Sequence, residues 1–140
     1  DPESPTVWCA EGVLPYLPQT AVAALLDTIS SLSAVGSRLA ADSVIDIEGL
    51  VAQIAASPSF DSRPSELQVD IGGIGVQSSP CVDVAGHLRR RGWEAKGVDA
   101  SDLFELHELA PLADSLALYQ RIRLVKASAW SPKRSGNQGR

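Results

Sequence analysis

A single carboxylate, Glu11, directly follows the apolar run Val7–Ala10 and is followed by Gly12. A short apolar run bounded by Pro5 and Gly12 predicts a buried strand. In open α/β sheets, ligands bind at the carboxyl ends of the strands. Burying a carboxylate is costly unless another group donates a hydrogen bond to it. Glu11 is therefore a candidate binding residue.

A glycine cluster at Gly72–Gly75 is a second candidate site, with Asp70 before it and Asp99 at the end of a later predicted strand. Glycines of this kind allow close approach to a nucleotide cofactor, and an acid at the end of the second strand can bind ribose hydroxyls. However, Gln77–Pro80 lie where a tight turn should lead directly into a helix. Two interpretations stay open: a cofactor loop, or a loop beside an ordinary strand, with Asp99 capping or preceding a helix.

The histidines and cysteines offer no recognisable catalytic or metal-binding pattern. His87 and His107 have no Ser or Cys partner at a typical spacing, so we expect surface or half-buried histidines. Cys9 and Cys81 form no CxxC pair, and we expect two reduced thiols and no metal site. No residue is assigned as catalytic.

Length and composition indicate one domain without a membrane or nucleic-acid partner. The chain has 140 residues and 44% apolar content, which fits a domain over residues 1–130 and a disordered polar tail over residues 131–140. The net charge of −5 argues against nucleic-acid binding. Apolar runs fall well short of the roughly 18 residues of a spanning helix, and no leader pattern is present. We expect a cytoplasmic protein.

Apolar periodicity predicts alternating strands and helices. The expected strands are Val7–Ala10, Ser37–Ile45, Glu66–Ile71, Trp93–Val98 and Tyr119–Trp130. The expected helices run from Pro18 toward Gly36, over Ile47–Ala56, from Val82 to Gly92, and from a Ser101 cap to Pro111. This alternation indicates an α/β layered sheet.

Charged clusters are explained by helix ends. Asp42, Asp46 and Glu48 are expected to be acids at a helix start, and Arg89–Arg91 a solvated helix end, because both arrangements complement the helix dipole. Trp93 is expected to anchor a helix-to-strand turn in the core.

The segment Pro5–Pro18 (PTVWCAEGVLPYLP), together with Leu25–Ala34, Gly36–Leu39 and His87–Trp93, resembles the leucine carboxyl methyltransferase-like family of S-adenosyl-L-methionine-dependent methyltransferases. The resemblance is to mycobacterial and actinobacterial members. It implies the C-terminal half of a class I, Rossmann-like sheet, mostly parallel with a final antiparallel strand. It also implies that the family's glycine-rich cofactor loop lies upstream, which argues against that role for Gly72–Gly75.

The resemblance assigns roles to the opening segment. It implies that Glu11 and Gly12 bind S-adenosyl-L-methionine, while Leu14 and Tyr16 line the substrate pocket for a small-molecule or carboxylate acceptor. The implied activity is methyl transfer to an oxygen by a truncated chain.

A catalytically inactive remnant or interaction module is the alternative. In that case the apolar edge of the strand at residues 6–10 would pair with another chain.

Overall fold

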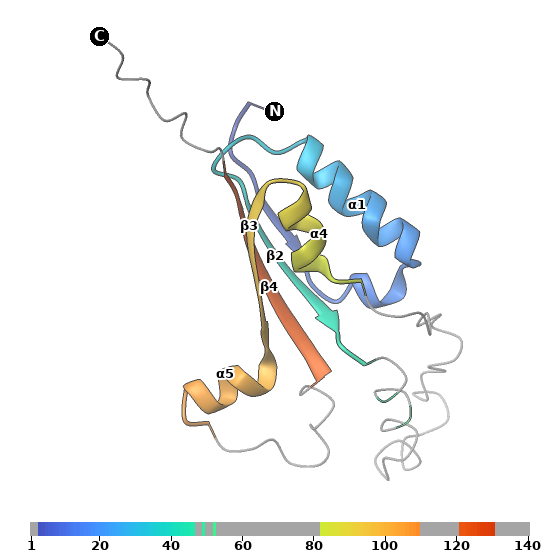
Figure 1. Cartoon of the computed structure of the whole chain (residues 1–140), viewed down its shortest axis with the longest axis vertical. Helices are drawn as coiled ribbons and strands as arrows, with labels where there is room; N and C mark the ends of the chain where they lie inside the picture. The colour runs from blue at the N-terminus through green and yellow to red at the C-terminus, as the bar shows by residue number, and fades with distance from the viewer. Residues whose placement is uncertain (1–2, 47–48, 50–51, 53–81, 110–120, 131–140) are drawn as a thin grey trace, which may run out of the picture.

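The computed structural model describes residues 3–46, 49, 52, 82–109 and 121–130, and its α/β architecture agrees with the sequence prediction (Figure 1). The elements, in chain order, are β1 (Val7–Ala10), η1 (Leu14–Tyr16), α1 (Gln19–Ser31), β2 (Arg38–Val44), α4 (Val84–Arg90), β3 (Trp93–Asp99), α5 (Ala100–Leu106) and β4 (Ile122–Ala129). No helix in these ranges is long and apolar enough to cross a membrane.

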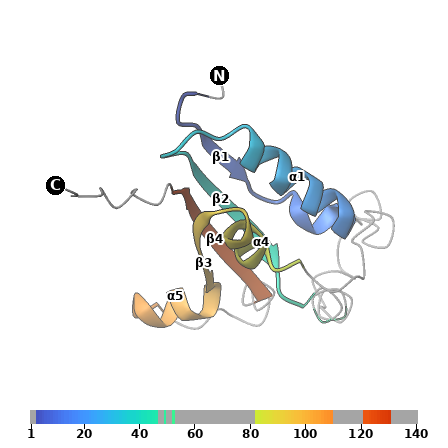
Figure 2. The ribbon, with the colours of Figure 1, turned by 45° about the horizontal axis from the view of Figure 1, so that its top comes forward.

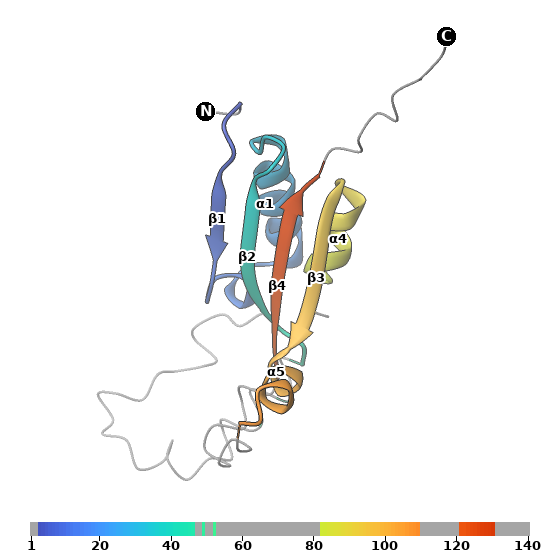
Figure 3. The ribbon, with the colours of Figure 1, turned by 90° about the vertical axis from the view of Figure 1, so that its left-hand side faces the viewer.

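The described strands form one mixed sheet in the order β1-β2-β4-β3. β1 pairs with β2 in parallel, whereas β4 is antiparallel to both β2 and β3 (Figure 3). The predicted final antiparallel strand is confirmed. The prediction of a mostly parallel sheet is wrong for these strands, because β4 inserts between two strands of the same direction and makes two of the three ladders antiparallel.

α1 and α4 both lie on one face of the sheet (Figures 1 and 2). Successive side chains of a strand point to opposite faces of the sheet, so every second strand residue faces the helices. The core combines residues of the covered face with apolar residues of the helices: Ala10, Leu14, Val22, Leu26, Ile29, Leu39, Ala41, Val84, Ala85, Leu88, Trp93, Val125 and Ala127. On the other face, Val7, Cys9, Ala40, Lys96 and Lys126 are exposed. The prediction that Val7–Ala10 is a buried strand is therefore wrong for this face, because the described helices cover only the other one (Figure 3).

Two indole rings form hydrogen bonds from the sheet to serines at the end of α1 and just after it. Trp8 Nε1 donates to Ser33 Oγ at 2.9 Å, and Trp93 Nε1 donates to Ser30 Oγ at 3.0 Å. Trp93 is only 5% exposed, so its predicted role as a core anchor at the start of β3 is confirmed. Each ring buries a large apolar surface while its one polar atom keeps a partner, which stabilises a single position of the helix.

Asp27 links the two helices. Its Oδ1 lies 2.6 Å from His87 Nε2, and its Oδ2 accepts from Arg91 Nη2 at 2.6 Å. The hydrogen bond from His87, reinforced by Arg91, holds the pKa of Asp27 below its ordinary value. His87 is half-buried and Arg89–Arg91 are exposed at the end of α4, both as predicted, but the sequence did not reveal this α1–α4 connection.

Several local predictions need correction or fall outside the described ranges. Ser101 does not cap the last helix, since α5 begins at Ala100 and Asp99 precedes it without a capping hydrogen bond from its side chain. Asp42 lies within β2 rather than at a helix start, because the strand extends to Val44. Asp46 Oδ1 accepts from the Gly49 amide at 2.9 Å, as a cap would.

The remaining predictions on the middle and end of the chain concern residues that the structure does not describe. These are most of the helix Ile47–Ala56, the strand Glu66–Ile71, the cluster Gly72–Gly75 and the tail over residues 131–140.

Leu26→Ala tests the packing of α1 on the sheet. Leu26 is fully buried, so we expect its truncation to lower the free energy of unfolding by about 2–5 kcal/mol in urea denaturation. Leu32→Ala, at the exposed C-cap of the same helix, is the control and should cost below about 0.5 kcal/mol. Equal losses for the two variants would contradict this packing.

Asp99 pairs with Arg123 across β3 and β4, through Oδ1 to Nε at 2.6 Å and Oδ2 to Nη2 at 3.2 Å. The hydrogen bond from Arg123 lowers the pKa of Asp99. A lowered pKa in the folded state means that the pair stabilises the fold above the unfolded-state pKa of about 3.9, and that this stabilisation is lost as the pH falls through the folded-state pKa.

We therefore expect Asp99→Asn to reduce the fall in the free energy of unfolding between about pH 5 and pH 2, measured by urea denaturation at each pH. Glu94→Gln, which removes an exposed carboxylate from the same strand, is the matched control and should keep the wild-type pH dependence. An unaltered profile in Asp99→Asn would show that the pair does not contribute.

Candidate functional site

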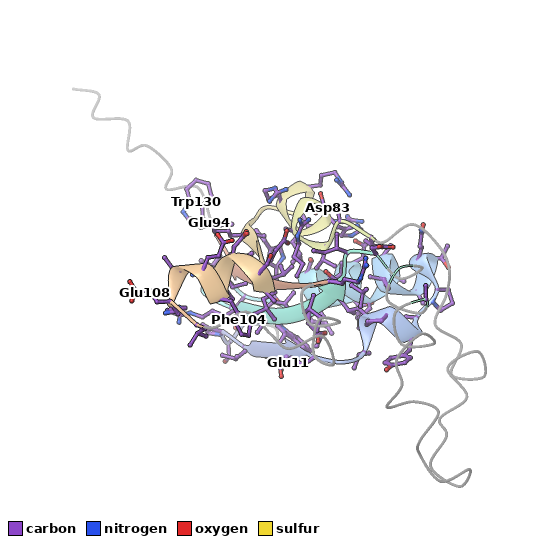
Figure 4. All side chains as sticks on the ribbon, turned by 90° about the horizontal axis from the view of Figure 1, so that it is seen from below. Glu11, Asp83, Glu94, Phe104, Glu108 and Trp130 are labelled. Carbon is purple, nitrogen blue, oxygen red and sulfur yellow. The ribbon has the colours of Figure 1, made fainter. Side chains whose placement is uncertain are left out.

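The carboxyl ends of β1, β2 and β3 meet at one edge of the sheet. This follows from the ladders, since β1 runs with β2, and both β2 and β3 run against β4. The edge therefore carries the residues that follow Ala10, Val44 and Asp99, and β4 begins there at Ile122. Figure 4 views the molecule from this side. Such an edge is where open α/β sheets bind ligands.

Glu11 lies at this edge as the sequence predicts and is exposed (Figure 4). Within the described residues its carboxylate has no hydrogen-bond or ion-pair partner. The expected cost of burying Glu11 therefore does not arise in the described part. An exposed carboxylate without a partner is free to accept hydrogen bonds from a positively charged or hydroxyl-bearing ligand.

Gly12 turns the chain immediately after Glu11. Its φ of +63° lies in the left-handed region, which a residue with a Cβ adopts at a cost of about 1–2 kcal/mol. No described heavy atom lies within 4 Å of the position that a Cβ would occupy, so the described part of the chain leaves the space beside this backbone open. The Gly12 amide donates to Asp42 Oδ1 at 2.8 Å.

The two residues predicted to line the substrate pocket have different surroundings. Both lie in η1, with Pro15 between them. Leu14 is only 5% exposed and belongs to the core, whereas Tyr16 is 48% exposed. Of the two, only the Tyr16 side chain is available to a ligand in the described structure, and the pocket assignment of both residues stays a prediction.

Two ion pairs lie at this edge among the described residues. Arg121 contacts Asp46, and Arg123 contacts Asp99. The Asp99 carboxylate raises the pKa of the Arg123 guanidinium, which remains charged. Both carboxylate oxygens of Asp99 bind Arg123, so the structure shows Asp99 in a structural ion pair. The glycine cluster Gly72–Gly75 of the second candidate site lies outside the described residues.

The remaining candidates lie apart from this arrangement. His87 belongs to the contact between α1 and α4, and His107 is the exposed C-cap of α5. Cys9 is an exposed free thiol on β1. The described residues contain no group of three or more His, Cys, Asp or Glu side chains that could hold a metal ion.

Sequence reasoning missed Asp42 as a neighbour of Glu11 and Gly12. The parallel register ends at Ala10↔Ala41, so Asp42 is the first β2 residue beyond the last pair. The available signal was strand alternation: Asp42 shares a face with Arg38 and Ala40, opposite to the buried Leu39 and Ala41. Alternation places Asp42 beside the turn only if β1 is known to pair with β2, and the local sequence does not show this pairing.

Comparison with known proteins identifies the relatives of this chain. A family model described as "Leucine carboxyl methyltransferase" matches residues 1–30, which include the whole Glu11–Tyr16 segment. A protein of Mycolicibacterium vanbaalenii is 42% identical over 127 residues, covering 91% of this chain and 42% of the relative. A Mycobacterium marinum protein is 38% identical over 115 residues, covering 82% of this chain and 38% of the relative.

Both relatives bear the name "Putative S-adenosyl-L-methionine-dependent methyltransferase", as does a second M. vanbaalenii protein that is 37% identical over 116 residues, covering 83% of this chain and 37% of the relative. The chain spans about two fifths of the length of these relatives. The similarity extends well beyond the opening segment, because it covers most of the chain. By sequence, most of the chain is thus similar to proteins named as S-adenosyl-L-methionine-dependent methyltransferases, and its first 30 residues match the leucine carboxyl methyltransferase family model.

Proposed function

We propose that this chain is part of an S-adenosyl-L-methionine-dependent methyltransferase that transfers a methyl group to an oxygen of a small-molecule or carboxylate acceptor. The observation that carries the proposal is the Glu11–Gly12 turn. It presents the exposed Glu11 carboxylate at the edge where β1, β2 and β3 end. This turn lies within the residues matched by the family model, and the relatives' names supply the cofactor.

The residues of this edge fit part of such a cofactor. The methionine portion of S-adenosyl-L-methionine carries an ammonium group, for which an exposed carboxylate is a suitable acceptor. Glu11 offers that carboxylate, and the open space beside Gly12 allows close approach to the backbone. Gly12 thus has two uses, since it also permits the left-handed turn that follows Glu11.

When bound, the cofactor supplies a methyl group already activated on a sulfonium, so the protein needs little acid–base chemistry. The work of the chain is then to bind and to orient. Glu11 fixes the methionine end, and the exposed ring of Tyr16, on the next element, borders the acceptor side. Leu14, the other residue predicted to line the pocket, belongs to the core of the described structure.

We further propose that residues 1–130 correspond to the C-terminal portion of a class I methyltransferase domain. The mixed sheet, in which β4 runs against its neighbours, supports this assignment. The chain spans 42% of the length of the first M. vanbaalenii relative, as a portion of a domain would.

Calorimetric titration of the 140-residue chain with S-adenosyl-L-methionine tests the proposal. We expect saturable binding, and we expect Glu11→Gln to weaken it about tenfold, the loss of about 1.4 kcal/mol that one charge-assisted contact can supply. Glu94→Gln removes another exposed carboxylate, at the start of β3, and should leave binding unchanged. Absence of heat at about 5 mM cofactor, or equal losses in both variants, would contradict the proposal.

A module that pairs through β1 is a second candidate function, favoured by the edge position of this strand. In the described sheet β1 has a neighbour only on the β2 side, and Val7 is 78% exposed. An edge strand of apolar residues is a template for pairing with another strand. The partner that we propose is a second copy of the chain.

Val7→Lys tests this second candidate by sedimentation analysis. A lysine on an edge strand opposes pairing, so a dimer formed by the wild-type chain should become monomeric. The fold should persist because the side chain is already exposed. A wild-type chain that sediments as a monomer at high concentration would rule out self-pairing.

A further inference from the structure

We propose that Asp42 is a positioning residue that fixes the Glu11–Gly12 turn and thereby directs Glu11 at the cofactor. The inference rests on the proposed function for the identity of the ligand, but its structural part stands on contacts within the chain. Asp42 lies on β2, the neighbouring strand, and reaches the turn through its side chain rather than through the ladder.

The contact occurs where backbone pairing stops. β1 and β2 are paired up to Ala10↔Ala41, after which the chain leaves the sheet at Glu11. Beyond this point the Gly12 amide needs another acceptor, and Asp42 Oδ1 provides one at 2.8 Å. A bond from an amide to an ionised carboxylate is stronger than a bond between neutral groups.

The turn requires such support because its conformation is specific. Gly12 adopts a φ of +63°, and glycine loses more conformational freedom on ordering than any other residue. Without the Asp42 contact, the peptide unit that joins Glu11 to Gly12 is free to rotate through coupled changes in Glu11 ψ and Gly12 φ, because glycine adopts left- and right-handed φ about equally. The backbone at Glu11 then moves with it. Both residues are exposed, so no surrounding core fixes the turn.

The geometry also explains why an acid occupies position 42. Asp42 is on the sheet face opposite the helices, between the exposed Ala40 and the strand end. Its β4 partner is Leu124, which is 42% exposed and carries no opposite charge. In the described structure the one hydrogen-bond partner shown for the Asp42 carboxylate is the Gly12 amide.

The first test needs no cofactor and is made on the amide of Gly12 by nuclear magnetic resonance. In the wild-type chain we expect the exchange of this amide with solvent to be at least about tenfold slower than that of a freely exposed amide. In Asp42→Ala the protection and the downfield shift of the amide proton should be lost. Asp42→Asn, which keeps an acceptor oxygen, should restore most of both. An unprotected Gly12 amide in the wild-type chain would overturn the proposal even if Asp42→Ala did not fold.

The second test separates positioning from a general structural role through a double-mutant cycle with S-adenosyl-L-methionine as the probe. We expect Asp42→Ala to weaken binding about tenfold in the wild-type background and not at all in the Glu11→Gln background, because its effect acts through Glu11. Asp46→Ala is the matched control: it removes a carboxylate from the same edge that contacts Arg121 and the Gly49 amide instead of Gly12.

Equal losses for Asp42→Ala and Asp46→Ala, or an Asp42→Ala loss of the same size in both backgrounds, would overturn the positioning role. Failure of the proposed function is distinguishable, because a wild-type chain that does not bind the cofactor still reports the Asp42 contact through the Gly12 amide.

Discussion

β4 lies between β2 and β3, and this position sets the direction of the neighbouring strands and the place where they end. β4 supplies both antiparallel ladders and holds β2 and β3 in the same direction. With β1 parallel to β2, three strands then end at one edge of the sheet. Glu11, Asp42 and Asp99 lie close to that edge only because of this order, although they are widely separated in the sequence.

The helical layer supports that edge from one face. Trp8 and Trp93 bind serines near the end of α1, and Asp27 joins α1 to His87 and Arg91 of α4. These contacts hold the helices over β1 and β3, and a close-packed core fills the space between. The opposite face of the sheet presents exposed side chains, and Asp42 reaches the Glu11–Gly12 turn from there.

Local patterns in the sequence predicted the elements with good accuracy. The apolar run at Val7–Ala10, the helical period between Pro18 and Gly36, and the glycine at position 92 each determine an element through nearest neighbours along the chain. Glu11 was likewise predictable at a strand end, because its position depends only on where β1 stops.

The order and direction of the strands were not predictable in the same way. The pairing of β2 with β4 joins Arg38 to Ser128, and no local pattern reports on such a contact. The sequence interpretation assigned Asp42 to a helix start from its acidic type, although the predicted strand Ser37–Ile45 contains it and β2 ends at Val44. It missed the partners of Asp27 and Asp99 because these lie on distant elements. Side chains that act across strands become visible only once the register is known.

Ultraviolet crosslinking of radiolabelled S-adenosyl-L-methionine to the 140-residue chain, followed by tryptic peptide mapping, shows whether the cofactor contacts the turn after β1. The sequence places residues 1–38 in one tryptic peptide, and the Gly72–Gly75 cluster in the next, residues 39–89. We expect label in the first peptide, near Glu11, and we expect excess unlabelled cofactor to displace it. Displaceable label at Gly72–Gly75, or none anywhere, would contradict it.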